Sequence, residues 1–436
     1  MPDVKKHLAI ITAIALCCLS SSCTHTRLRP APSDNPLIKP LDAAIAKGLD
    51  YLAANANGKD GSFGTRAPGE NGKETYKPDT GITGLVVAAA AKSPFAEYEK
   101  EQPYFKRAVE FLVANIRKDG SIVEEGKEYS NYKTAIALTA LGALGEPGEY
   151  GKTISDAQDF IRSRQFNENR NVTREMWRYG GIGYGGRVGR PDLSNTQWAV
   201  EALRETGVGA EDPLFKKVVV FLKRCQNESG GNDYDGKQAG LIRINDGGAR
   251  YSPIESKVRV TVPGGKYKLP SYGSMTYAFL KSMIYAGVDR DDPRVQAAFR
   301  WIVRNYSLDA NPGFSGEKNA GRQGLFYYYH TMSKALLVMG ESTLRTDDGK
   351  THDWARELSR KIISLQREDG SWKNECSERW FEGNPSLVTA YGILALNNCR
   401  RALSTQIENA KSPGRRSCGA LCAGLSRQPR SNHYDS

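Results

Sequence analysis

A histidine in the C-terminal half is the residue best suited to chemistry. His330 stands in the segment YYYHT at positions 327–331. An imidazole titrates near neutral pH, so it can move protons, and its neutral form is a common metal ligand. The same side chain can also be a hydrogen-bonded histidine in the wall of a cavity. The residue type alone leaves these roles open.

A scattered set of acids and amides is the second source of chemistry. Paired carboxylic acids serve hydrolysis and lyase reactions, but no spacing in the chain selects a pair. Asp79 and Asp192 also fit as caps of helix N-termini. The candidates are Asp79, Asn131, Asp192, Asn195, Asp246, Glu255, Asn374, Glu375 and Glu382.

Aromatic residues gather in the same regions of the chain. Aromatic faces stabilise cations by about 0.5–2 kcal/mol each, as a carbocation reaction requires, and they also pack well in an ordinary core. The residues are Tyr132, Trp198, Tyr272, Tyr277, Tyr328, Tyr329 and Tyr391.

The segment DRDD at positions 289–292 is a run of three acids around one arginine. Pro293 follows it directly and opens an amphipathic segment. Carboxylates at a helix start cap free amides and interact favourably with the helix dipole. We therefore expect DRDD to cap a helix.

The elements that position these residues form a repeat. Six segments have apolar residues at helical spacing on one face and charges on the other, which is typical of surface helices. Several end in a related turn, and the sharpest copy is LQREDGSW at positions 365–372, where Gln366, Gly370 and Trp372 follow the spacing Q-x-x-x-G-x-W. Glycine favours the left-handed conformation that ends a helix.

A second set of six segments alternates with the first and is apolar nearly all round, which indicates buried helices. Each carries a threonine, and these are Thr80, Thr134, Thr196, Thr276, Thr331 and Thr389. Six exposed helices alternating with six buried ones predict an all-α, (α/α)6 toroid of six helical hairpins in a single domain. A polar, glycine-rich insertion at 230–270 interrupts the spacing.

These motifs resemble the squalene cyclase / protein prenyltransferase superfamily. The resemblance is carried by the Q-x-x-x-G-x-W ending, PDLSNTQWAVEAL at 191–203 and FYYYHTMSKAL at 326–336, and it covers residues 41–403. It implies an α/α toroid with a deep central cavity and an isoprenoid-type substrate. Cyclases of this type protonate an alkene with an Asp-x-Asp-Asp motif, whereas the one such motif here starts an outer helix.

The resemblance also implies a zinc site in the prenyltransferase manner. His330 would be one ligand, and Asp246 would be another, from an Asp-x-Cys motif upstream. Gly248 stands where the cysteine is expected. Zinc is therefore a weak expectation, and no other cofactor is predicted.

The two ends of the chain differ from the repeat. Residues 1–23 combine two lysines, a short apolar run and three serines before Cys23, which predicts a signal peptide of the lipoprotein type with lipidation at Cys23. Residues 24–40 would be a linker, and the polar, basic residues 404–436 a disordered tail. The net charge of +12 is spread among acids, which indicates a solvated helical surface and no nucleic-acid partner.

We therefore expect an exported, monomeric protein, periplasmic or anchored to the envelope membrane, that acts on or binds a small apolar isoprenoid-type molecule. The alternatives are a non-catalytic binding or scaffold protein at the envelope and a polysaccharide-acting toroid enzyme. The expected catalytic group is His330 with Asp246 and Tyr329. The expected substrate-binding residues are Asp192, Asn195, Tyr272, Tyr328, Trp372 and Glu375.

Overall fold

The structure is a computed structural model that describes residues 28–68, 73–126, 129–145, 148–185, 188–316 and 318–411. The predicted signal peptide, Cys23 and residues 412–436 lie outside these ranges. The chain divides into two compact units, residues 1–31 and residues 32–436. All the helices and strands given below belong to the second unit.

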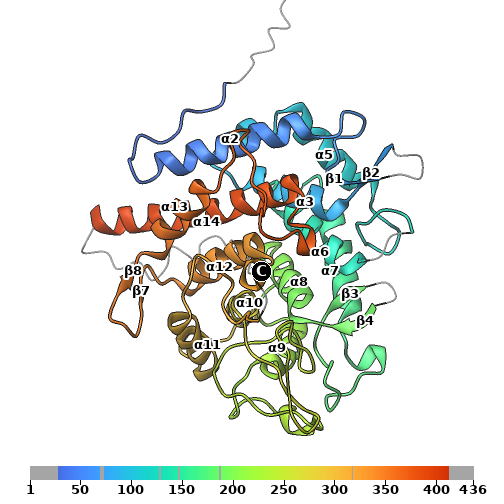
Figure 1. Ribbon diagram of the computed structural model, residues 1–436. Helices are drawn as coiled ribbons and strands as arrows, with labels where there is room; N and C mark the ends of the chain where they lie inside the picture. The colour runs from blue at the N-terminus through green and yellow to red at the C-terminus, as the bar shows by residue number, and fades with distance from the viewer. Residues whose placement is uncertain are drawn as a thin grey trace, which may run out of the picture. The chain divides into compact units, whose positions relative to one another are not determined.

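Six helices form an inner ring (Figure 1). Each packs against the next along the chain, and the last packs against the first, so the ring is closed. They are buried nearly all round; every residue of α3, for example, is buried. The inner helices are α3 (Thr80–Ala91), α6 (Ser130–Gly142), α8 (Leu193–Glu205), α10 (Gly273–Tyr285), α12 (Leu325–Met339) and α14 (Pro385–Lys411).

Six amphipathic helices lie outside this ring and bury one face against it. Arg400 of α14 pairs with Asp42 of α2 across 2.6 Å, which ties the last inner helix to the first outer one. The outer helices are α2 (Lys39–Asn55), α5 (Pro103–Ala114), α7 (Gly151–Arg164), α9 (Pro213–Cys225), α11 (Pro293–Arg304) and α13 (Trp354–Ser364). The predicted (α/α)6 toroid is confirmed.

The remaining elements are short and lie in the connections. Within the described ranges the strands form four two-stranded antiparallel hairpins, namely β1 (Gly64–Pro68) with β2 (Glu74–Pro78), β3 (Gly183–Gly185) with β4 (Val188–Pro191), β5 (Val260–Val262) with β6 (Lys266–Lys268), and β7 (Leu344–Arg345) with β8 (Thr351–His352). The other helical turns are α4 (Ala96–Glu99), η1 (Glu168–Arg170), η2 (Asp235–Lys237), η3 (Ala320–Arg322) and η4 (Arg379–Phe381).

The repeated turn motif joins neighbouring hairpins. The side-chain amide of Gln366 donates to the carbonyls of Gly370 and of Ala44 in α2, both at 2.9 Å. Gln165 and Gln226 donate in the same way to the next outer helices, α9 and α11. The motif is thus a clamp between consecutive outer helices.

The repeated threonines link the turns to the inner helices. Thr134, Thr196, Thr276 and Thr389 each accept a hydrogen bond from a backbone amide of the preceding turn. In the first repeat Thr83 accepts this bond, from the amide of Phe63. The sequence interpretation chose Thr80 there and was one helical turn too early.

The end of α14 differs from the expectation that residues 404–436 are a disordered tail. The helix continues to Lys411, eight residues beyond Leu403. Ile407 packs against the core, and the first residue that disfavours a helix is Pro413, which also restricts the residue before it.

Candidate functional site

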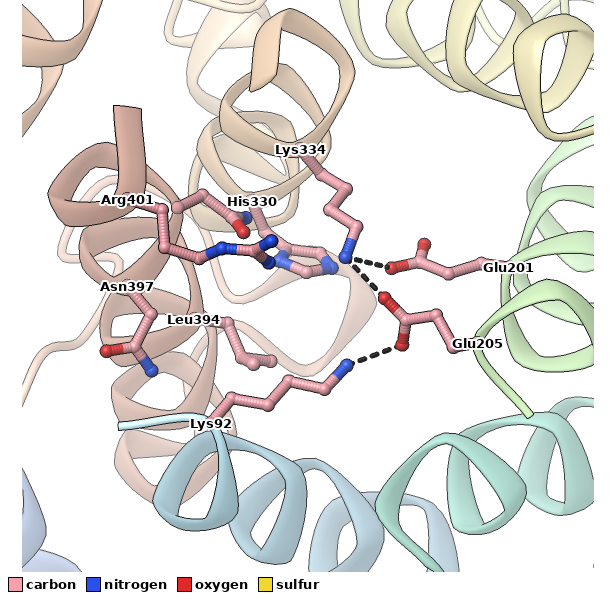
Figure 2. A pocket seen from close by; sticks show the side chains of 9 residues that line it. Lys92, Glu201, Glu205, His330, Lys334, Leu394, Asn397 and Arg401 are labelled. Carbon is pink, nitrogen blue, oxygen red and sulfur yellow. Dashed lines mark hydrogen bonds and ion pairs between the residues drawn. The ribbon is translucent and has the colours of Figure 1, made fainter. Parts of the chain in front are cut away.

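A cavity of about 290 Å³ lies inside the inner ring. We call it the chamber, and Figure 2 shows its lining. Of its residues Arg401 is exposed and Lys92 and Glu205 are partly exposed, so these three side chains reach solvent. The side chains come from four inner segments: Lys92 at the end of α3, Glu201 and Glu205 of α8, His330 and Lys334 of α12, and Leu394, Asn397, Asn398 and Arg401 of α14.

A chain of ion pairs crosses the chamber wall (Figure 2). Lys92 lies 2.5 Å from Glu205, and Lys334 contacts the other oxygen of the same carboxylate. Lys334 also lies 3.5 Å from Glu201, and Glu201 pairs with Lys281 of α10. Lys281 and Glu201 are almost fully buried. A buried charge needs such a partner because its desolvation is costly.

The lysines keep both acids ionised. Burial opposes the charge on Glu201, but Lys281 and Lys334 outweigh it and lower the pKa of this carboxyl to about 2. Burial likewise opposes ionisation of Glu205, yet Lys334 and Lys92 hold its pKa well below the usual range. Neither acid carries a proton to donate at neutral pH.

His330 forms the inner wall of the chamber. Its ring stacks between Trp198, at 5.4 Å and 14°, and Tyr391, at 5.6 Å and 25°. Burial, followed by the nearby Lys281, lowers the pKa of His330 to about 3. Both ring nitrogens are buried and have no hydrogen-bond partner among the described residues. His330 is therefore a neutral group with one free donor and one free acceptor.

An aromatic layer continues from His330 toward the N-terminal ends of the inner helices. Tyr132 packs edge-on against Trp198 at 6.4 Å, and Tyr327 packs edge-on against Tyr391 at 6.0 Å. The Tyr327 hydroxyl lies 3.1 Å from that of Ser194 at the start of α8. These contacts join α6, α8, α12 and α14 on this side of the chamber.

Asp192 lies next to this layer and caps α8. One of its oxygens accepts from the amide of Asn195 at 2.9 Å and the other from the Asn195 side chain at 2.7 Å. Burial raises the pKa of Asp192 to about 7, and hydrogen bonds from Asn195 and Tyr251 limit the rise. Tyr251 belongs to the 230–270 insertion, which thus covers the start of α8.

Known proteins share this fold and part of this sequence. Residues 70–240 match the family described as squalene-hopene cyclase C-terminal domain. The type II terpene cyclase MstE from Scytonema, as a variant in complex with geranylgeranyl dihydroxybenzoate, superposes with a TM-score of 0.51 at 14% identity, over 84% of this chain and 99% of that one. The chain therefore has an α/α toroid, and its residues 70–240 are similar to the squalene-hopene cyclase C-terminal domain.

The toroid is shared more widely. An unsaturated glucuronyl hydrolase specific for heparin superposes with a TM-score of 0.51 at 11% identity, over 84% of this chain and 98% of that one. No curated protein sequence matches the chain. At these identities the solved structures support the fold alone, so activity has to be argued from the site.

Of the three expected catalytic residues, His330 alone lines the chamber. Tyr329, the preceding residue on the helix, points elsewhere, and its hydroxyl donates to the carbonyl of Leu308 at 2.5 Å. Asp246 lies in a loop of the insertion and accepts from Ser271 at 2.8 Å and from the amide of Gly248 at 3.0 Å. Asp246 is thus a turn residue in this toroid.

The expected substrate-binding residues lie in several places. Asp192 and Asn195 lie together beside the aromatic layer. Tyr272 packs edge-on against Phe314 at 5.2 Å at the start of α10. The Tyr328 hydroxyl donates to the carbonyl of Ser307 at 2.8 Å.

The remaining two, like the other four, do not line the chamber. The indole of Trp372 is fully buried and donates to the carbonyl of Ile362 at 2.8 Å. It belongs to the clamp between hairpins. Glu375 is exposed, and its nearest charged partner is Arg367 at 4.0 Å.

The DRDD segment caps an outer helix, as the sequence predicted. Asp292 accepts from the amide of Arg294 at 2.9 Å and pairs with its guanidinium at 2.6 Å. A hydrogen bond from that guanidinium lowers the pKa of Asp292. An ionised cap on the outside of the toroid is no proton donor to its interior.

The chamber does not fit a zinc ion. Lys92, Lys281 and Lys334 surround His330, and both nearby carboxylates are held by these lysines. Within the described residues, no group of three His, Cys, Asp or Glu side chains could hold a metal. The pairing of His330 with Asp246 therefore has no support in the geometry.

Sequence reasoning missed the charged residues of the chamber. A signal for them exists, because Glu201, Lys281 and Lys334 each lie within an otherwise apolar helix, in AVEAL, AFLKSM and MSKALL. A charge among buried residues needs a buried partner. The partners of these buried charges lie on other helices, and the sequence does not identify which residues they are.

Proposed function

We propose that the protein binds an isoprenoid-type molecule, with the polar end of that molecule in the chamber. The observation that carries the proposal is the pair of unpartnered ring nitrogens on His330, buried inside a squalene cyclase-like toroid. A buried polar group without a partner is costly. A ligand group that donates to one nitrogen and accepts from the other would remove that cost.

The apolar part of the ligand would meet Leu394 in the chamber and the aromatic residues beyond it. Trp198 and Tyr391 lie directly against the His330 ring. A long chain must therefore displace this stack to enter the aromatic layer, or leave the chamber beside Arg401. The Scytonema cyclase in its complex with geranylgeranyl dihydroxybenzoate has the same toroid.

Binding is favoured over cyclisation in the chamber because no protonated carboxylic acid lines it. Glu201 and Glu205 are ionised, and His330 is neutral. The same argument disfavours a polysaccharide-acting enzyme here, although the glucuronyl hydrolase shares the fold. Hydrolysis of a glycosidic bond needs a carboxylic acid that stays protonated.

A catalytic function is the second candidate, and Asp192 favours it. This acid is buried beside an aromatic layer, and its pKa of about 7 leaves it partly protonated at neutral pH. Such an acid can transfer a proton. In this case Asp192→Asn would abolish turnover while retaining ligand binding.

Native mass spectrometry of the protein purified without detergent tests the proposal. We expect a bound mass that fits a polyisoprenoid and that is lost or reduced in His330→Phe, a variant that keeps an aromatic ring in the stack. A bound mass that fits an oligosaccharide would contradict the proposal. If His330→Phe retains the ligand at full occupancy, the ligand does not depend on His330, and the chamber is not its binding site.

The place of action is proposed to be the cell envelope, because residues 1–23 resemble a lipoprotein signal. None of the helices in the described ranges is long and apolar enough to cross a membrane. We expect the full-length protein in the membrane fraction and Cys23→Ser in the soluble exported fraction. Equal partition of both forms would contradict a lipid anchor.

A further inference from the structure

The chamber contains a cation without a carboxylate partner. Lys92 and Lys334 are paired with Glu205, and Lys281 with Glu201. Arg401 lines the same cavity, and it makes no ion pair with an acid among the described residues. Figure 2 shows its side chain extending from α14 across the view of the chamber. The guanidinium thus lines the cavity without a carboxylate partner among the described residues.

Two further residues in the chamber carry polar atoms without partners. Both ring nitrogens of His330 are free within the described part of the chain. The side-chain oxygen of Asn397 is also buried and unpartnered, although its nitrogen donates to the carbonyl of Ala89 at 3.3 Å. Buried polar groups in native proteins are normally satisfied. Two such residues facing one cavity indicate a ligand with its own donors and acceptors.

We propose that the chamber is a binding site for a small oxyanion, a carboxylate or phosphate group, that carries a neighbouring hydroxyl group. The oxyanion would bind at Arg401, whose planar fork of donors matches two oxygens. The hydroxyl would bind at His330, since a hydroxyl both donates and accepts. This goes beyond the proposed function, because it rests on the chamber alone and does not require an isoprenoid chain.

Charge and size support an anion of this kind. Among the lining residues three cations, Lys92, Lys334 and Arg401, face two acids, Glu201 and Glu205. The imidazole adds no charge. A cavity of about 290 Å³ is at the lower end of ligand pockets, which span roughly 300–1,000 Å³. A small anion would therefore balance the excess positive charge of the lining residues, whereas a bound cation would be repelled by it.

Isothermal titration of the full-length protein at fixed ionic strength tests this site, with inorganic phosphate, acetate and glycolate as probes. We expect either phosphate or the two carboxylates to bind. The class that binds then identifies the oxyanion of the ligand as a phosphate or a carboxylate. Arg401→Gln should weaken this binding about tenfold or more. Arg300→Gln is the matched control, because Arg300 is an exposed arginine on outer helix α11 and its loss should leave binding unchanged.

The hydroxyl part has its own comparison. Glycolate is acetate with a hydroxyl on the adjacent carbon, so it should bind several-fold more tightly than acetate, and His330→Phe should remove this gain. If neither phosphate nor a carboxylate binds to the protein, the proposal is overturned. Equal affinity of Arg401→Gln and the wild type would also overturn it.

Farnesol, an isoprenoid without an anion, separates this proposal from the proposed function. Anion binding that depends on Arg401, without farnesol binding, supports the oxyanion site and shows that an isoprenoid chain without the anion does not bind. Farnesol binding without anion binding overturns the oxyanion site and leaves the isoprenoid proposal standing.

Discussion

Replacing His330 by Phe should make the protein less sensitive to acid. The ring of His330 is buried between Trp198 and Tyr391, and Lys281 lies near it. In the unfolded chain this imidazole has a pKa of 6.5, whereas in the folded protein its pKa is about 3. Phe keeps an aromatic ring in the stack and removes the titration.

The sign follows from the lowered pKa. Above pH 6.5 the imidazole is neutral in both states and costs nothing. Between pH 6.5 and pH 3 the unfolded chain binds a proton that the folded protein excludes, so the folded state loses stability as the pH falls. Each pKa unit corresponds to about 1.4 kcal/mol. At pH 5, about 1.5 units below the unfolded pKa, the loss is about 2 kcal/mol.

The assay compares thermal unfolding of the wild type and His330→Phe at pH 7.5 and pH 5.0. All other titrating groups are common to both proteins, so they cancel in the difference. We expect the gap in the free energy of unfolding between the two proteins to shift by about 2 kcal/mol in favour of the variant at pH 5. This corresponds to about 2–3 °C in Tm for a domain of this size. A gap that does not change with pH would refute the burial of a neutral imidazole at this position.

Three further predictions concern the frame of the site, each measured by urea unfolding at pH 7. Glu201→Gln leaves the buried Lys281 without its partner, and we expect a loss of about 3–5 kcal/mol; a loss below 1 kcal/mol would mean that this lysine is not charged in the fold. Asp292→Ala removes a helix cap on the outer surface, so we expect a loss of about 1 kcal/mol with ligand binding unchanged, and lost binding would disagree with its place outside the ring. Gly370 has a φ of +86°, and a Cβ there would come within 2.4 Å of the carbonyl oxygen of Lys47; Gly370→Ala should therefore cost about 3 kcal/mol, and a neutral substitution would contradict the clamp geometry.

The candidate site was only partly predictable from the sequence. His330 was identified because histidine is rare in this chain and lies in a buried, aromatic segment. Tyr329 and Tyr328 were included with it as neighbours in sequence. Successive residues of a helix project about 100° apart, so the two tyrosines face the outer layer, where their hydroxyls reach the carbonyls of residues 307 and 308.

Asp192 and Asp292 were also only partly predictable from the sequence. Asp192 and Asp292 were predicted as caps, and both accept backbone amides in the structure. Their position before a helical segment is a local signal that a sequence contains. Their pKa values differ in direction, raised for Asp192 and lowered for Asp292. That difference comes from burial and from the Arg294 guanidinium, which depend on the whole fold.

The sequence by itself determined the toroid of this protein. Periodicity, the repeated turn and the alternation of amphipathic and apolar segments are local patterns, and twelve helices with such patterns have few ways to bury their apolar faces. Only the tertiary structure decided the chamber. Its ion pairs join α3, α8, α10 and α12, and they bring together residues as far apart in the chain as Glu201 and Lys334. Which charges meet depends on the order and rotation of the helices around the ring, and no spacing along the sequence records it.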